Sequence, residues 1–248
     1  MHRVPFRRMT KTAVILAAGM GTRLRAVVGL RPKGLLPWEG KTLIEHSLDR
    51  LAGADVERVV MAVGFEAEQY RLNLKRFPLP VEFVLNQDYA ATGSMHSLAL
   101  CREKLREDFF LLESDLLYEQ RALDALHRSP ERDLVLLSGP TQAGDEVYVY
   151  GADSILQAVS KNRLDLPLLG ELVGISKVSR TLFGLMCRHY ASRTIDPKYD
   201  YEHCLADVSS LHPIRTVKVE DLAWVEIDGP EHLERAERVV GPRLRAGA

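Results

Sequence analysis

The sequence of 248 residues has few of the features that mark secreted, zinc-binding or membrane-spanning proteins. Its three cysteines, Cys101, Cys187 and Cys204, stand far apart, which does not suit a disulfide framework and predicts free thiols in a reducing cytoplasm. His203 precedes Cys204, but no second pair of zinc ligands lies at a suitable spacing. No apolar run approaches the roughly 20 residues that a membrane-spanning helix needs. We therefore expect a cytoplasmic protein without a membrane span.

An excess of one charge sign is also missing, because 33 basic and 34 acidic residues give a formal net charge of -1. This balance argues against a general binder of nucleic acid or membrane surfaces. Residues Met1–Arg8 are basic but lack the apolar stretch of a signal peptide, so we expect an N-terminal extension at residues 1–8. With 46% hydrophobic and 27% charged residues, the remainder is typical of one globular domain, which we place at residues 9–240.

The first half of the sequence alternates between short apolar runs and segments with helical periodicity. Strands are predicted at Val14–Ala18, Val56–Val63, Val81–Leu85, Phe109–Glu113 and Leu134–Ser138. Helices are predicted between them at Thr42–Leu51, Glu66–Lys75, Ser94–Leu105 and Gln120–His127. This alternation predicts an α/β fold with a mostly parallel, mixed sheet that is flanked by helices and binds ligands at the carboxyl ends of its strands.

The pattern changes after about residue 138, where shorter elements follow one another. Antiparallel strands are expected at Val147–Val149 and Ile155–Val159, around a turn at residues 151–153. Further strands are expected at Glu171–Lys177, Arg215–Lys218 and Trp224–Ile227, and helices at Arg180–Ala191 and from Pro230 onward. No internal repeat or linker separates these elements, so we expect a small subregion of the same domain.

A glycine-rich segment follows the first predicted strand. Residues 16–24 read Leu-Ala-Ala-Gly-Met-Gly-Thr-Arg-Leu, and a Pro-Lys-Gly sequence follows at residues 32–34. The glycines let the backbone approach a ligand closely, and successive N–H groups beside Arg23 and Lys33 are typical of a site for a polyphosphate.

Two better-known phosphate motifs do not fit the sequence. A dinucleotide-binding loop needs a third glycine where this sequence has Leu24. A P-loop ending at Gly40-Lys41-Thr42 would need an earlier glycine at the position of Leu35. Gly40 and Lys41 are therefore predicted to form a tight turn before a helix.

Two predicted strands lead into aspartates, Asp115 and Asp228. Carboxylates at the carboxyl edge of a sheet suit a hard cation such as Mg²⁺, which takes oxygen ligands. An aspartate at the end of a strand can also simply begin a turn. Because both occur together with the glycine loop, we favour Mg²⁺ as the cofactor, held by Asp115 and Asp228.

Several later segments carry more specific patterns of polar residues. They are Asn86–Met95, Leu111–Tyr118, Ser138–Tyr148, Ser160–Arg163, Gly170–Ile175, Tyr201–His203 and Trp224–Asp228. Together they resemble the 2-aminoethylphosphonate cytidylyltransferases, a family of nucleotidyltransferases related to phosphocholine cytidylyltransferases. The resemblance extends from Lys11 to about Arg238. It implies a Rossmann-like fold of the nucleotide-diphospho-sugar transferase type, with a small acceptor-binding subregion.

The reaction that the resemblance implies joins CTP to 2-aminoethylphosphonate, giving CMP-2-aminoethylphosphonate and pyrophosphate. The acceptor oxygen is already anionic, so positioning and cations supply the catalysis, and no general base is needed. The implied catalytic residues are Arg23 on the β- and γ-phosphates, Lys33 on the α-phosphate, and Asp115 and Asp228. The implied nucleotide contacts are Ala17, Ala18, Gly19, Met20, Gly21, Thr22, Asn86, Gly93 and Ser94. Ser94 is equally suited to be an N-cap.

On the acceptor side, the resemblance points to Lys161 as the partner of the phosphonate, with a solvated surface lysine as the alternative. The ammonium group of the acceptor needs anionic partners once it loses its water. The candidates are the acids Asp145, Glu146, Glu171 and Glu202, together with Tyr148 for a cation–π contact. Any of these acids could instead be a surface salt-bridge partner. For His203 we favour a structural role.

Three other functions stay open at this point. A phosphocholine cytidylyltransferase would use the same chemistry with an aromatic site for the methylated amine. A sugar- or inositol-phosphate nucleotidyltransferase would need groups that bind hydroxyls. A nucleotide-binding regulator without activity would be expected to lack Arg23, Lys33 or one of the two aspartates, and all of them are present. The expected partners are CTP and a small amino-phosphonate, without nucleic acid or membrane, and a homodimer is one expected form.

Overall fold

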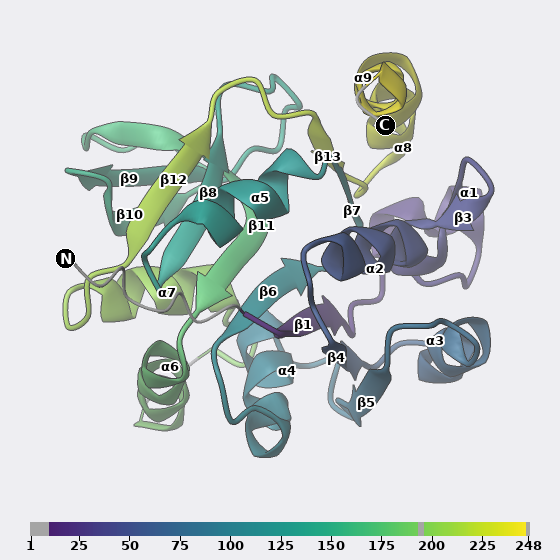
Figure 1. Ribbon diagram of the computed structural model, residues 1–248, viewed down its shortest axis with the longest axis horizontal. Helices are drawn as coiled ribbons and strands as arrows, with labels where there is room; N and C mark the ends of the chain where they lie inside the picture. Colours follow the sequence, from purple (N-terminus) through teal and green to yellow (C-terminus); the bar gives the residue numbers. More distant parts are fainter. Residues whose placement is uncertain (1–9, 193–195, 247–248) are drawn as a thin grey trace, which may run out of the picture.

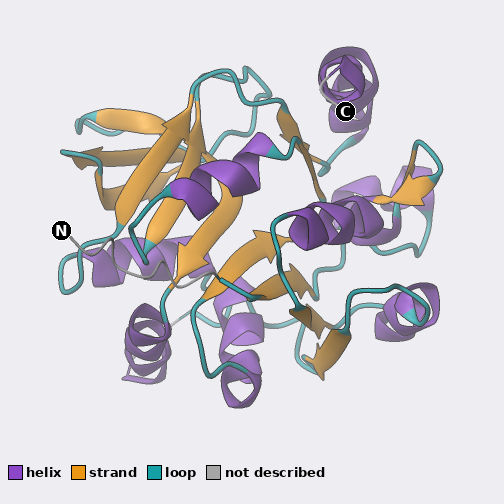
Figure 2. Cartoon of the chain, in the orientation of Figure 1, coloured by secondary structure: helices purple, strands orange, loops and turns teal. Residues whose placement is uncertain are grey.

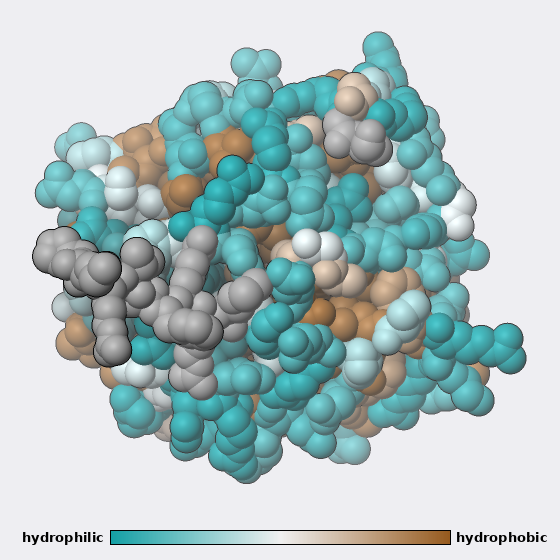
Figure 3. Space-filling view, viewed as in Figure 1, coloured by the Kyte–Doolittle hydropathy of each residue, from teal (hydrophilic) through white to brown (hydrophobic). Residues whose placement is uncertain are grey.

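The computed structural model describes residues 10–192 and 196–246 (Figure 1). The extension predicted at residues 1–8 lies outside these ranges. Helices flank a central sheet on both of its faces (Figure 2). On the face shown in Figure 3, hydrophilic residues predominate and apolar residues show between them. None of the helices in the described ranges is both long and apolar enough to cross a membrane.

One part of the nine-stranded sheet is parallel, as the alternating pattern predicted. Its strands lie in the order β5 (Val81–Leu85), β4 (Arg58–Val63), β1 (Thr12–Ala17) and β6 (Phe109–Glu113). The helices of this part are α2 (Leu43–Gly53), α3 (Ala67–Leu74) and α4 (Ser94–Leu100), followed by a 3₁₀ helix at Cys101–Lys104. The α/β fold class is confirmed, and the parallel strands direct their carboxyl ends to one edge of the sheet.

The other part of the sheet is mainly antiparallel. Beyond β6 the order is β11 (Leu168–Val178), β8 (Leu134–Ser138), β12 (Arg215–Val219), β10 (Ile155–Ser160) and β9 (Tyr148–Ala152). Of these neighbours only β8 and β12 are parallel. Strand β9 also pairs with β11, so the five strands close on themselves. The chain turns between β9 and β10 at Asp153 and Ser154, with φ of 52° and 59°, slightly later than predicted.

Alternation along β1 divides the core into two layers. Ala13 and Ile15 pack with helices α2, α3 and α5 (Arg121–Arg128). Val14 and Leu16 pack on the opposite face with α4, α6 (Arg180–Ser192) and α7 (Tyr201–Ser209). The sequence analysis did not predict α7, although its buried residues recur at helical spacing, at positions 201, 204, 205 and 208.

A third apolar cluster joins the C-terminal segment to the region after the glycine loop. Strand β13 (Trp224–Glu226) pairs antiparallel with β7 (Leu116–Tyr118), with Glu226 opposite Leu116. The chain then continues as α8 (Pro230–Arg235), a π-helix (Ala236–Val240) and α9 (Gly241–Ala246). This pairing brings two acidic segments together that lie more than 100 residues apart in the sequence.

The remaining short elements lie between β1 and α2. They are a 3₁₀ helix (Thr22–Leu24), α1 (Arg25–Val28), a 3₁₀ helix (Lys33–Leu35), β2 (Pro37–Trp38) and β3 (Lys41–Thr42). Strands β2 and β3 form a hairpin whose turn contains Gly40 at a φ of 82°. Thr42 and Glu45 then form a capping box at the start of α2. A turn thus precedes α2 as predicted, but it consists of Glu39 and Gly40, one residue earlier than expected, because Lys41 already belongs to β3.

Candidate functional site

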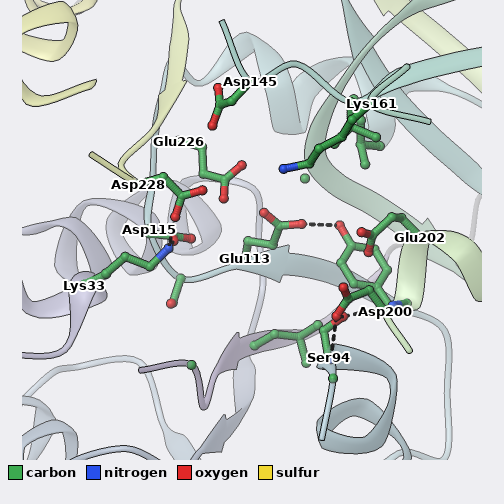
Figure 4. Close-up of a pocket in the computed structure, with 18 of the residues that line it drawn as sticks. Lys33, Ser94, Glu113, Asp115, Asp145, Lys161, Asp200, Glu202, Glu226 and Asp228 are labelled. Atoms are coloured by element: carbon green, nitrogen blue, oxygen red, sulfur yellow. Dashed lines mark hydrogen bonds and ion pairs between the residues drawn. The ribbon is translucent and has the colours of Figure 1, made fainter. Parts of the chain in front are cut away.

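A cavity of about 780 Å³ lies at the carboxyl ends of β1 and β6 (Figure 4). Its wall includes the glycine loop after β1, the loop at residues 139–147, part of β11 and the start of α7. This is the edge of the sheet at which ligands were expected. Arg23, Lys33, Asp115 and Asp228, the predicted catalytic residues, all line it.

The glycine loop is shaped to bring Lys33 close to the backbone. Gly21 has a φ of 56°, in the left-handed region that favours glycine. A Cβ at this position would lie only 2.7 Å from Cγ of Lys33. Within the described ranges, no loop or cap hydrogen bond uses the backbone N–H groups of Gly19, Met20 or Gly21. These groups are donors of the kind that bind phosphate oxygens.

The predicted nucleotide contacts from this loop are only partly at the cavity wall. Ala18 and Gly19 line the cavity. Ala17 instead packs into the core at 3% exposure. Met20, Gly21 and Thr22 are not part of the wall in this structure. Their contribution to a ligand site would come from the backbone of the loop.

Lys33 forms ion pairs with Asp115 and Asp228 at one end of the cavity (Figure 4). Arg23 Nη2 lies 2.5 Å from the other carboxylate oxygen of Asp228. Burial opposes the charge of Lys33, but the carboxylates of Asp115, Asp228 and Glu226 outweigh it and raise its pKa. Burial likewise opposes ionisation of Asp228, but Lys33 and Arg23 prevail and lower its pKa. Lys33 and Asp228 therefore both stay charged at neutral pH.

A second feature, which the sequence analysis missed, is a cluster of three carboxylates. Carboxylate oxygens of Glu113, Asp115 and Glu226 all lie within 4.8 Å of one another. Burial and the charge of Asp115 raise the pKa of Glu113 to about 7. Burial, Glu113 and Asp115 raise the pKa of Glu226 well above its usual value. An all-oxygen set whose charges repel suits a hard divalent cation such as Mg²⁺.

The sequence contained a signal for both missed glutamates. Glu226 lies two residues before Asp228, a spacing that places side chains on the same side of a strand. Glu113 is the last residue of β6, two residues before Asp115. Their convergence depends on the pairing of β7 with β13. Asp115 and Asp228, expected as a pair of metal ligands, both contact Lys33 here, and Asp115 also faces the two glutamates.

Asn86 was predicted to contact the nucleotide, but it does not line the cavity. It is 1% exposed, and its Nδ2 donates to Thr92 Oγ1 and Ser97 Oγ, each at 3.0 Å. Its Oδ1 accepts the backbone N–H of Asp88 at 2.9 Å. All hydrogen-bonding atoms of the side chain are therefore engaged in holding the loop between β5 and α4.

Gly93 and Ser94 line the cavity, yet their polar groups bind the segment that leads into α7. The N–H of Gly93 donates to the carbonyl of Pro197 at 2.7 Å. The N–H and hydroxyl of Ser94 both donate to Asp200 Oδ1 at 2.9 Å, and Ser94 Oγ accepts the N–H of Tyr201. The two residues join α4 to α7. Because their polar groups are already hydrogen-bonded, they would contact a ligand mainly by van der Waals packing.

The replacement of Gly93 by alanine tests this connection. A Cβ at Gly93 would lie 2.4 Å from the carbonyl oxygen of Tyr199. To relieve this clash, the backbone at Gly93 or at Tyr199 would have to shift, which costs more than moving a flexible side chain. We expect Gly93→Ala to lower the free energy of unfolding by about 2–4 kcal/mol, measured by denaturant titration. The control is Gly184→Ala in α6, where a Cβ meets only the end of the Arg188 side chain and helix propensity favours alanine. Equal changes of the free energy of unfolding in the two variants would contradict the tight packing of Gly93 against the segment before α7.

Two residues that were predicted to bind the acceptor, Lys161 and Glu202, lie at the end of the cavity away from Lys33. Lys161 is exposed and directs its ammonium group into the cavity (Figure 4). The Glu202 side chain is 16% exposed on α7. Burial raises the pKa of Glu202 to about 8, assisted by the charges of Glu113 and Asp200 and opposed by Lys161. The ring of His203 is near the same carboxylate, with Nδ1 3.7 Å from Glu202 Oε1.

Two of the predicted acids support the loop at residues 139–147. Glu171 lines the cavity, and its Oε2 accepts the N–H of Thr141 at 2.8 Å. Glu146 Oε1 accepts the N–H of Gly144 at 3.1 Å. Burial opposes the charge of Glu146, but backbone N–H groups and the Tyr148 hydroxyl outweigh it and lower its pKa. Both carboxylates therefore have partners within the protein.

The remaining acceptor predictions need correction. The guanidinium of Arg163 lies 4.0 Å from the ring centre of Tyr148. Tyr148 therefore already makes a cation–π contact, with Arg163 and not with an acceptor. Tyr148 is also absent from the cavity wall. Asp145 lines the cavity at the end opposite Glu202, with Oδ2 3.9 Å from Arg23 Nη1 (Figure 4). Asp145 thus belongs to the charged centre around Arg23.

Comparison with known proteins gives matches over most of the chain. Among curated proteins, CMP-5'-(3-aminopropyl)phosphonate synthase of Streptomyces rubellomurinus is 30% identical over 239 residues, covering 91% of this chain. This chain spans only 38% of the length of that relative.

Two solved structures share the fold over nearly the full chain. The inositol-1-phosphate CTP transferase from T. maritima has a TM-score of 0.83 at 21% identity, covering 98% of this chain and 99% of its own. The CTP:phosphocholine cytidylyltransferase from Streptococcus pneumoniae has a TM-score of 0.74 at 21% identity, covering 92% and 99%. At this identity the likeness establishes the nucleotide-diphospho-sugar transferase type of fold. Residues 13–173 match the family model of the MobA-like NTP transferase domain, so the chain belongs to that family.

Proposed function

We propose that the protein is a cytidylyltransferase that converts CTP and 2-aminoethylphosphonate into CMP-2-aminoethylphosphonate and pyrophosphate. The observation that carries this proposal is the arrangement of Lys33 and Arg23 on Asp228 and Asp115, beside a loop with unengaged backbone N–H groups. Such a group of cations and oriented donors suits a triphosphate that becomes more negative at its leaving oxygen.

The chemistry requires one bond to form and one to break. A phosphonate oxygen of the acceptor donates an electron pair to the α-phosphorus of CTP, and the bond to the bridging oxygen of pyrophosphate breaks. Arg23 and the N–H groups of the glycine loop would hold the β- and γ-phosphates. Lys33 would leave its carboxylates and stabilise the charge at the α-phosphate. Because the attacking oxygen is anionic, no residue has to remove a proton.

A divalent cation is part of the proposal. Asp115 and Asp228, with Glu113 and Glu226 next to them, are the residues that would hold Mg²⁺. Bound there, Mg²⁺ supplies positive charge against the triphosphate. Burial, and after it repulsion from the neighbouring carboxylates, raises the pKa values of Glu113 and Glu226, and a bound cation would favour their charged forms.

For the acceptor, we propose that Lys161 binds the phosphonate and Glu202 the ammonium group. Both side chains line the cavity, and the ammonium group of Lys161 points into it (Figure 4), which supports a site in which both ends of a short zwitterion have a partner. The name of the Streptomyces relative includes an aminopropylphosphonate, which supports an amino-phosphonate as the substrate class. The names of the two structural neighbours, both with CTP, support the choice of nucleotide.

A phosphocholine cytidylyltransferase is the second candidate, because one structural neighbour carries that name. A methylated ammonium is bound best by aromatic faces. Tyr148, the aromatic residue expected for that task, contacts Arg163 instead, and acids surround the acceptor end. The chemistry of the cavity therefore favours a primary amine.

The assay that tests the proposal is pyrophosphate release from CTP and Mg²⁺ with different acceptors. The acceptors are 2-aminoethylphosphonate, 3-aminopropylphosphonate, phosphocholine, phosphoethanolamine and a sugar 1-phosphate. We expect the highest kcat/KM with 2-aminoethylphosphonate. A higher kcat/KM with phosphocholine would favour the second candidate, a phosphocholine cytidylyltransferase. Binding of CTP without turnover of any acceptor would point to a regulator.

The raised pKa of Glu202 predicts a pH-dependent stability for the ligand-free protein. The group binds a proton more tightly when folded than when unfolded, so its stabilising effect is complete below about pH 4.5 and is lost as the pH rises through about 8. Glu202→Gln should therefore lose less stability between pH 6 and pH 9, with Tm at pH 9 about 5 °C above the wild type. Thermal unfolding of both proteins at a series of pH values between 6 and 9 measures this difference in Tm.

The matched control is Glu131→Gln at an exposed position. It should follow the wild-type curve of Tm against pH. A Glu202→Gln curve parallel to the wild type would contradict the assigned pKa. Some slope should remain in every variant because Glu113, whose pKa burial raises to about 7, also titrates in this range.

A further inference from the structure

His232 links two acids that flank Arg23, and the sequence analysis did not single it out. It lies in the first turn of α8 at 3% exposure. The backbone N–H of Asp228 donates to His232 Nδ1 at 3.1 Å. Because Nδ1 accepts this hydrogen bond, the ring proton is on Nε2.

The protonated nitrogen faces the loop at residues 139–147. Nε2 of His232 lies 3.4 Å from Oδ1 of Asp145, and the exposed Glu231 is 3.9 Å away. The other oxygen of Asp145 lies 3.9 Å from Arg23 Nη1. On its other side, Arg23 Nη2 contacts Asp228 at 2.5 Å. One imidazole therefore contacts both residues whose carboxylates flank the guanidinium.

We propose that His232 is a positioning residue that restrains Asp145 and so keeps Arg23 available to the triphosphate of the incoming nucleotide. This inference rests on the proposed function, in which Arg23 binds the β- and γ-phosphates. At 3.9 Å the pair of Asp145 and Arg23 is longer than a charge-assisted hydrogen bond, which is about 2.7–2.9 Å. The contact with His232 holds Asp145 at that longer distance.

The physical reason is competition for one guanidinium. A carboxylate that closes onto Arg23 takes the donors that a phosphate needs and adds a negative charge where the triphosphate must lie. Asp145 has a side chain 28% exposed, on a loop, so it has room to move toward Arg23 if His232 no longer holds it. Loss of the His232 contact should therefore weaken nucleotide binding through Asp145.

Two substitutions separate the two contacts of the ring. His232→Asn places an amide oxygen near the position of Nδ1 and keeps the acceptor for Asp228, but it has no group at Nε2. His232→Gln places an amide nitrogen near Nε2 and keeps an N–H group close to Asp145, but it leaves the N–H of Asp228 unpaired. We expect His232→Asn to raise Kd for CTP with Mg²⁺ about 10-fold while kcat at saturating CTP changes less than about threefold. His232→Gln should bind CTP within about threefold of the wild type although it is the less stable variant.

A double-mutant cycle with Asp145→Asn tests the route through Asp145. In that background His232→Asn should change Kd for CTP by less than about twofold, because no charged carboxylate is left to compete. An equal increase of Kd in both backgrounds would assign His232 a structural role and overturn the proposal. If His232→Asn does not fold, Asp145→Asn alone decides: an unchanged or lower Kd supports the proposal, and a higher Kd overturns it.

Titration calorimetry measures these Kd values independently of turnover. If the wild type binds CTP but releases no pyrophosphate with any acceptor, the proposed function fails, and the binding cycle still decides the role of His232. If turnover is normal but the cycle shows additive effects, the positioning role fails alone.

Discussion

Asp115→Asn should abolish turnover and leave the fold intact. Asp115 is 5% exposed, contacts Lys33, and shares the carboxylate cluster with Glu113 and Glu226. Asparagine keeps the shape but removes the charge that orients Lys33 and that would hold Mg²⁺. We expect pyrophosphate release to fall by about 1,000-fold, the upper end of the range seen when a preorganised electrostatic group is lost. The measurement is kcat under saturating CTP, acceptor and Mg²⁺.

The control for this variant is Asp124→Asn on α5. Asp124 forms an exposed ion pair with Arg128 one helical turn away, so its loss should leave turnover unchanged and cost at most about 0.5 kcal/mol. Circular dichroism and Tm establish that both variants are folded. Turnover within about tenfold of the wild type for Asp115→Asn would remove Asp115 from the catalytic group.

Lys33→Ala should reduce kcat more than it reduces the affinity for CTP. In the ligand-free protein the Lys33 side chain is 16% exposed, and its ammonium group forms ion pairs with Asp115 and Asp228. Exchanging these carboxylates for the α-phosphate brings little net gain in the ground state. Its charge matters most as negative charge builds up around the α-phosphorus. We expect kcat to fall by about 100- to 1,000-fold and Kd for CTP to rise by less than about fivefold.

Single-turnover kinetics and calorimetry separate these two effects. Lys41→Ala is the control, because Lys41 forms an exposed pair with Asp49 outside the cavity. A large rise in Kd at normal kcat would make Lys33 a ground-state anchor of the triphosphate. Removing Lys33 also leaves buried carboxylates without their cation, so Tm should fall in the absence of Mg²⁺ and recover when Mg²⁺ is added.

Local patterns in the sequence were sufficient for one part of the fold and for the centre of the site. The apolar runs of β1, β4 and β6 are buried on both faces, and such strands can be recognised from their composition alone, whereas β5 is a partly exposed edge strand. The glycine loop could be recognised because Gly21 meets a backbone requirement that few other residues can satisfy. Lys33, Arg23, Asp115 and Asp228 were expected near one another, and they are in contact.

Other features were outside the reach of local patterns. Glu226 approaches Asp115 only because β13 pairs with β7, and no short-range signal specifies that pairing. The hydrogen bonds of Asn86, Gly93 and Ser94 were missed because their partners lie in segments whose positions depend on packing. Tyr148 was assigned to the acceptor because the sequence does not reveal its contact with Arg163, which lies in the loop after β10.

The sequence by itself therefore determined the α/β class, the parallel strands, the glycine loop and the identity of the central cations and aspartates. The strands and the glycine loop follow from periodicity or from a local backbone requirement, and the roles expected of the four charged residues came from the resemblance to a known family. Only the tertiary structure decided which acids share a cation site, which acids already have partners, and that His232 lies between Asp145 and Asp228. Charges and hydrogen bonds act over a few ångströms, and only packing determines which distant segments come that close.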